Sequence, residues 1–271
     1  MEPAARPLWD VCARATIFDL GQPLDPQLPV SPNHPGFKMA LMRRHGDTVR
    51  ADGGSAANEM IMIGGHTGTH VDALCHVSHQ GHLHGDIDAA EAQRGGRFSV
   101  LGVETVPPIV GRGVLLDIAA LHGVDVLAPA HRITADELAA AARSQGVDVR
   151  EGDAVLIRSG WPAHWRDAEH FIGHRHGVPG PDEEAARWLA ARKVRVTGAE
   201  TVAYEWIPAG RGHALLPVHR VLLVEHGIYI VEMLDLTALA AARAYEFVFV
   251  LAPLKFVGAT GSPVRPLALV P

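Results

Sequence analysis

Six of the 17 histidines in this chain lie between positions 66 and 84. The first three belong to the run HTGTHVDALCH at 66–76, which also contains Asp72. Neutral imidazole and carboxylate are the usual ligands of a catalytic zinc or manganese ion. Such an ion lowers the pKa of a bound water to about 7 and polarises a carbonyl group. The run therefore predicts a catalytic metal centre.

The spacing also predicts the backbone conformation. His66, His70, Asp72 and His76 all occupy even-numbered positions, so an extended chain would point their side chains to one side. On a helix His66 and His70 would share a face, but Asp72 would turn away from it. Glycines before and inside the run also favour a non-helical approach. We expect extended chain or a loop.

Apolar runs alternate with helix-like stretches along the chain, which favours a single α/β domain over 1–271, with a mixed β-sheet flanked by helices. Strands are expected at 16–20, 38–43, 59–63, 113–117, 154–158, 194–197, 228–232 and 246–251. Helices are expected at 134–145, 181–192 and 236–242. Thr134 and Glu137 form a capping-box pattern for the first helix, Gly146 ends it, and Pro181 suits the first turn of the second.

Composition narrows the classes of function. The chain has 271 residues, 48% of them hydrophobic, and a net charge of −6. Because the chain has neither a basic stripe nor a long apolar run, we expect neither a nucleic-acid partner nor a membrane span. Two cysteines make no disulfide framework and the N-terminus does not resemble a secretory signal, so we expect a cytoplasmic protein.

The histidine run resembles the HxGTHxDxPxH motif of the metal-dependent cyclase family, which includes bacterial kynurenine formamidases and isatin hydrolases. The resemblance extends over nearly the whole chain and is greatest to a longer branch of the family. Five other segments also resemble the family: FDLGQPLDPQLPVSPNHPGF, GRGVLLDIA, EGDAVLIRSGW, PVHRVLLVEHGIYIVEMLDL and APLKFVGATGSPVRPLAL. It implies the cyclase or kynurenine-formamidase fold.

The resemblance also implies roles for individual residues. The implied metal ligands are His66, His70, Asp72, His219 and Glu232. His76 is implied as the catalytic base, and Leu74 stands where the family has proline. The metal is zinc or manganese, with one or two ions per subunit, and the residues leave both choices open.

The activity implied is hydrolysis of a C–N bond in a small amide, formamide or lactam, by metal-activated water and a His base. A lactone hydrolase, or a cyclase or dehydratase that activates a carbonyl on the same metal, is the alternative, and a metal-binding protein without catalysis is a third class. The family further implies a homodimer or homotetramer in which a neighbouring chain closes the pocket. The proline-bearing segment 22–36 is a candidate for that arm.

Other residues were candidates for the pocket or for structure. Trp161, after a Ser-Gly pair, is expected either to wall the substrate pocket or to be a core aromatic. His79 and His82 are expected to line the pocket or to lie in a solvated loop above it. Glu200 is interpreted as structure at the pocket edge, and Arg112 as part of a structural salt bridge.

Overall fold

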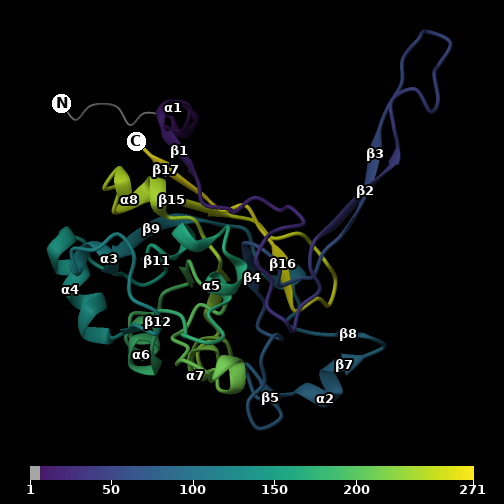
Figure 1. Ribbon diagram of the computed structural model, residues 1–271. Helices are drawn as coiled ribbons and strands as arrows, with labels where there is room; N and C mark the ends of the chain where they lie inside the picture. The colour runs from purple at the N-terminus through teal and green to yellow at the C-terminus, as the bar shows by residue number, and fades with distance from the viewer. Residues whose placement is uncertain (1–6) are drawn as a thin grey trace.

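The computed structural model describes residues 7–271, and a nine-stranded mixed sheet lies at its centre (Figure 1). In spatial order its strands are β1 (Thr16–Asp19), β17 (Leu267–Val270), β15 (Glu246–Leu251), β9 (Ile109–Asp117), β11 (Ala154–Arg158), β13 (Val196–Ala199), β14 (Tyr229–Glu232), β4 (His70–Asp72) and β16 (Gly261–Pro263). The four strands β9, β11, β13 and β14 are mutually parallel, and the strands on either side pair antiparallel. This confirms the predicted α/β fold with a mixed sheet.

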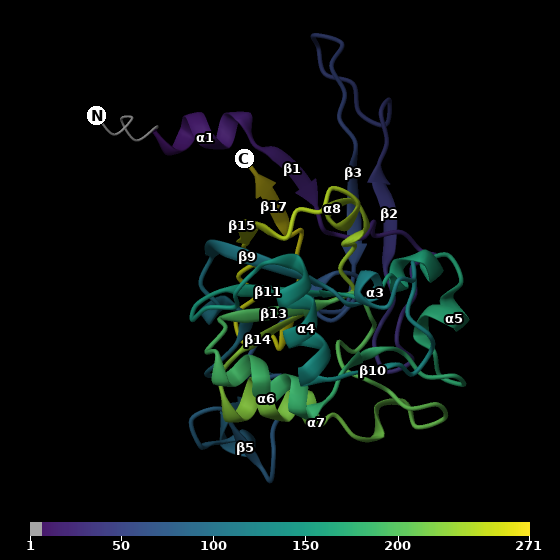
Figure 2. The same cartoon turned by 90° about the vertical axis from the view of Figure 1, so that its left-hand side faces the viewer.

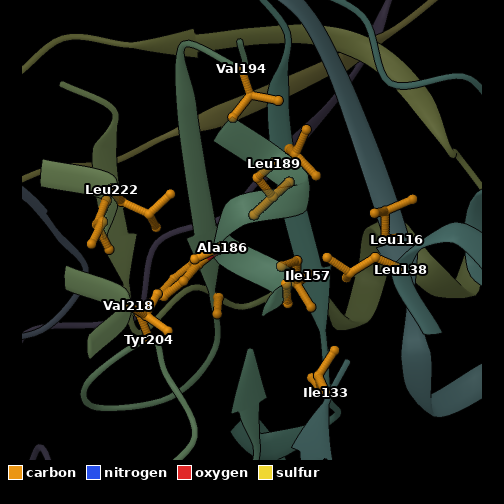
Figure 3. Packing of buried hydrophobic residues seen from close by; sticks show 14 of the residues in the cluster. Leu116, Ile133, Leu138, Ile157, Ala186, Leu189, Val194, Tyr204, Val218 and Leu222 are labelled. Atoms are coloured by element: carbon orange, nitrogen blue, oxygen red, sulfur yellow. The ribbon is translucent and has the colours of Figure 1, made fainter. Parts of the chain in front are cut away.

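Both faces of the central strands are buried, as their unbroken apolar sequences require. On one face Ile157 packs with Leu138 of α4 (Ala135–Gln145) and Leu189 of α6 (Glu183–Ala191), as Figure 3 shows. The π-helical segment η4 (Arg220–Glu225) contributes Leu222 to the same cluster. On the other face, Leu156 belongs to a cluster that includes residues of α8 (Thr237–Ala241) and α2 (Ala89–Ala92). The two layers hold the sheet as a rigid support for the loops at its ends.

Local capping signals determine where the helices begin. In α4 the predicted capping box between Thr134 and Glu137 is present, and Gly146 ends the helix in the left-handed conformation with φ of 68°. The expected start of α6 at Pro181 is wrong, because the Asp182 carboxylate caps the helix by accepting from the amide of Ala185. Pro181 instead belongs to β12 (Gly180–Pro181), which pairs with β10 (Arg132–Ile133).

A long hairpin made by β2 (Lys38–Arg43) and β3 (Asn58–Met62) projects from the body (Figures 1 and 2). Its apolar side chains Met39, Met60 and Ile61 are 56%, 58% and 53% exposed. In the segment 22–36, the candidate arm, Leu28 packs in a buried cluster with Trp161. The projecting element of this chain is therefore the hairpin.

The remaining elements are short. They are α1 (Leu8–Arg14), β5 (His82–Leu83), β6 (Ile87–Asp88), β7 (Gln93–Arg94), β8 (Arg97–Phe98), η1 (Val103–Thr105), α3 (Ile118–Leu121), η2 (Trp161–His164), α5 (Ala168–Ile172), η3 (Gly212–Ala214) and α7 (Pro217–His219). Among residues 7–271, no helix is long and apolar enough to cross a membrane.

Candidate metal centre

The centre is built where β4 pairs with β14. The antiparallel register places His70 directly opposite Glu232, and Asp72 lies two residues farther along β4 on the same face. The expectation of extended chain is correct for His70 and Asp72, whereas His66 and His76 lie in irregular segments on either side. Gly68 makes the turn into β4 with φ of 67°, and a Cβ there would lie 2.3 Å from the Leu24 side chain. Only glycine fits this turn without strain.

The structure brings the nitrogen and oxygen atoms of these side chains together. His66 Nδ1 lies 2.8 Å from Asp72 Oδ1, and His70 Nε2 lies 3.5 Å from the same oxygen. Across the strand pair, His70 Nε2 lies 3.3 Å from Glu232 Oε2. His219 Nε2 lies 3.2 Å from Glu232 Oε1 and 3.6 Å from Asp72 Oδ2. Five residues, three from the 66–72 segment with His219 and Glu232, thus lie close together.

This donor set fits a divalent ion. Ligand atoms bonded to one ion at about 2.1 Å lie about 3.0–3.5 Å apart, close to the separations observed here. Asp72 Oδ2 is buried and has no hydrogen-bond partner among residues 7–271, which is costly unless a cation binds it. Asp72 and Glu232 are also two buried carboxylates side by side, which a cation would neutralise. Because the two Asp72 oxygens face different histidines, the set has room for one ion or two.

His76 lies beside this set. Its ring stacks on His66 with centroids 3.9 Å apart, and a nitrogen of His76 lies within 4.8 Å of ligand atoms of His66 and Asp72. Burial lowers the pKa of His76 to about 3, so the imidazole is neutral at physiological pH. A neutral imidazole can accept a proton or bind a metal ion.

Glu205, which the sequence analysis did not single out, holds His219 in place. One oxygen of its buried carboxylate accepts from His219 Nδ1 at 2.6 Å, and backbone amides of Val218 and His219 also donate to the carboxylate at 3.1 Å. This fixes the proton on Nδ1 and leaves Nε2 free to face Asp72 and Glu232, as in carboxylate–histidine–metal triads. The only signal in the sequence was an acidic residue in an otherwise apolar stretch.

Other contacts orient the remaining histidines. His70 Nδ1 donates to the carbonyl of Gly68 at 2.7 Å, and His66 Nε2 lies 2.8 Å from Thr260 Oγ1. A Cβ on Gly261 would lie only 2.6 Å from the His66 ring, so this glycine leaves space for the ring. Burial opposes protonation of His70, but the carboxylates of Glu232 and Asp72 outweigh it and raise its pKa to about 8.

A cavity of about 270 Å³ opens onto the centre. Its apolar lining residues include Val30, Val202, Leu216 and Met233. Its lining also includes His34 and His213, and burial lowers the pKa of both imidazoles. From the sequence alone, His213 was expected to line the pocket or to lie in solvent, and nothing pointed to His34.

Trp161, His79 and His82, each expected either at the pocket or in a structural or solvated position, do not line the cavity. Trp161 is fully buried and donates from Nε1 to the carbonyl of Phe171, so it packs behind the wall that Val202 and Met233 form. His79 and His82 are exposed in a small hairpin, and neither lines the cavity.

Two further residues are structural, as expected. The carboxylate of Glu200, which follows β13, accepts from the amides of Ser159 and Gly160, which follow β11. Arg112 pairs with Asp153 and Glu246.

Comparison with known proteins shows the family of this chain. The family profile described as "Putative cyclase" matches residues 18–206. The chain belongs to this cyclase family. Its curated relatives include an isatin hydrolase of Roseibium aggregatum, which is 27% identical over 225 residues that cover 82% of this chain and 78% of the relative.

Solved structures of cyclase-family proteins have the same fold. A novel cyclase is 28% identical with a TM-score of 0.86, covering 97% of this chain and 91% of that one. A potential metal-dependent hydrolase with cyclase activity is 26% identical with a TM-score of 0.62, covering 95% of this chain and 100% of that one.

Proposed function

We propose that this chain is a metal-dependent hydrolase that cleaves the C–N bond of a small amide, formamide or lactam. The observation that carries the proposal is the convergence of three imidazoles and two buried carboxylates on the floor of a cavity, with a neutral His76 beside them. The similarity to an isatin hydrolase and to a potential metal-dependent hydrolase supports it.

The proposed ligands of the ion are His66, His70, Asp72, His219 and Glu232. A bound divalent ion would supply an activated water and would polarise the substrate carbonyl. His76 would accept the proton of the attacking water and return it to the leaving nitrogen, which departs poorly unless it is protonated. Glu205 keeps the proton of His219 on Nδ1 throughout. The donor types suit zinc or manganese, and one ion or two.

The cavity favours a small substrate with an apolar body. Its volume of about 270 Å³ is at the low end for small-molecule sites. A neighbouring cavity of about 250 Å³ shares Ser31, Asn33 and His213 with it and is also lined by His174 and Arg211. Ser31 Oγ is buried without a partner among residues 7–271. We propose that a polar or anionic substituent of the substrate points towards this neighbouring cavity.

A lactone hydrolase, or a cyclase or dehydratase that activates a carbonyl on the same metal, is the second candidate. The same ligands and the same base serve these reactions, and one relative is described as having cyclase activity. The alternatives differ in whether a leaving nitrogen must be protonated by His76.

The experiment is a substrate panel with the zinc- or manganese-loaded protein. Formamides, lactams and matched lactones of equal size are compared for kcat/KM, with the His76→Ala variant in parallel. Faster turnover of amides than of matched lactones supports the proposal. Turnover of lactones alone favours the second candidate, and turnover of none by metal-loaded protein favours a metal-binding protein without catalysis.

We also propose that the protein is a homodimer or homotetramer that acts on a small molecule in the cytoplasm, without a nucleic-acid or membrane partner. The apolar side chains that the β2–β3 hairpin exposes support self-association. Light scattering should give a mass at least twice the 29.0 kDa of the chain. Monomeric protein with full activity would contradict this assembly.

A further inference from the structure

A second group of ligand-type side chains lies away from the centre, near the start of α4. His122 follows α3, His131 precedes β10, and Glu137 lies in the first turn of α4. One nitrogen or oxygen atom from each lies within 4.8 Å of the other two. None of the three residues lines the catalytic cavity.

Both imidazoles point at the same carboxylate oxygen. Glu137 Oε1 lies 2.6 Å from His122 Nε2 and 2.9 Å from His131 Nε2. The rings meet edge to face at 72°, with their centroids 4.9 Å apart. Ligand atoms bonded to one ion at about 2.1 Å lie about 3.0–3.5 Å apart, so each imidazole nitrogen would move about 0.1–0.9 Å away from Glu137 Oε1 to admit an ion.

The carboxylate is already positioned by the helix cap. Glu137 Oε2 accepts from the backbone amide of Thr134 at 2.7 Å, which leaves Oε1 for the two histidines. The site is also open to solvent, since the side chains of His122, His131 and Glu137 are 40%, 25% and 19% exposed.

We propose that His122, His131 and Glu137 bind a transition-metal ion of the zinc type, at a site separate from the Asp72 centre. Two neutral imidazole nitrogens and one carboxylate oxygen favour zinc, cobalt or nickel over magnesium or calcium. The three protein ligands leave a fourth position for water. An ion here joins the end of α3, the turn before β10 and the start of α4, and so stabilises the fold. The proposal does not depend on the reaction at the centre.

The test is calorimetric titration of Zn²⁺ into protein whose catalytic centre is already loaded. Wild type should bind one more equivalent than the double variant His122→Ala/His131→Ala, and its melting temperature should rise with Zn²⁺ while that of the double variant does not. Glu137→Gln should weaken this site at least about tenfold. Because glutamine also serves in a capping box, this variant keeps the helix start and tests the site even if the double variant does not fold.

The matched control is His45→Ala, which removes an imidazole from the exposed hairpin. It should bind the same number of zinc ions as wild type, and all variants should keep the wild-type rate of hydrolysis. Equal zinc stoichiometry and affinity in wild type and in the Glu137→Gln and double variants would overturn the proposal.

Discussion

Replacing Glu205 by glutamine tests how the centre is organised, because the substitution changes the partner of His219 without changing the ligands. Glu205 accepts three hydrogen bonds, from His219 Nδ1, the His219 amide and the Val218 amide. A glutamine has one oxygen, so its NH₂ group must face at least one of these donors. If it faces Val218, a buried amide loses its acceptor, which costs about 1–3 kcal/mol.

If the NH₂ group faces His219 Nδ1, the proton moves to Nε2, and that nitrogen can no longer bind an ion. Loss of such a supporting carboxylate typically lowers metal affinity about 10- to 100-fold, or about 1.4–2.7 kcal/mol. We therefore expect Glu205→Gln to bind metal about 10- to 100-fold more weakly and to lose hydrolytic activity that excess metal partly restores.

The assay is competition for zinc with a chromophoric chelator, followed by activity against added metal. Glu151→Gln is the control, because Glu151 is 72% exposed and pairs with Lys193 at the surface. A dissociation constant within about twofold of wild type in Glu205→Gln, with unchanged activity, would refute the role assigned to Glu205.

Three further predictions concern residues around the centre and the core. His76→Ala should keep the wild-type metal content and lose at least about 100-fold in turnover, whereas His79→Ala should change neither; loss of metal would make His76 a ligand instead. Gly261→Ala should displace the His66 ring by about 1 Å and lower kcat/KM roughly 100-fold. The control Gly111→Ala should leave kcat/KM unchanged, because Gly111 has open space around it. Burial raises the pKa of Glu200 from 4.5 to about 7, so its protonation stabilises the fold fully below pH 4.5 and this stabilisation is lost as the pH rises through 7. Chemical denaturation of metal-loaded protein should show that, from pH 5.5 to 8, the free energy of unfolding of wild type falls by roughly 2 kcal/mol relative to that of Glu200→Gln. An equal dependence of the free energy of unfolding on pH in the two proteins would contradict this.

The sequence predicted what short-range spacing encodes. The alternation of His70 and Asp72 gave the strand and its inward face, and the Thr134–Glu137 pair gave the start of α4. The apolar run at 154–158 predicted the strand β11, whose first four residues are buried.

What the sequence did not reveal depends on contacts between distant segments. Glu205 reaches His219 across 14 positions, and Thr260 reaches His66 across 194. Trp161 belongs to the same buried cluster as Phe171 and Trp165, which its Ser-Gly flank does not encode. The hairpin that projects was assigned as strands correctly, but its separation from the body follows from packing that no local pattern describes.

Anomalous X-ray diffraction, recorded at the zinc and manganese absorption edges from crystals of metal-loaded protein, tests the central claim most directly. We predict a peak within bonding distance of an Asp72 carboxylate oxygen, flanked by His70 and Glu232, with a second peak towards His219 if two ions bind. Density without an anomalous peak beside Asp72, in protein that hydrolyses its substrate at full rate, would contradict the account.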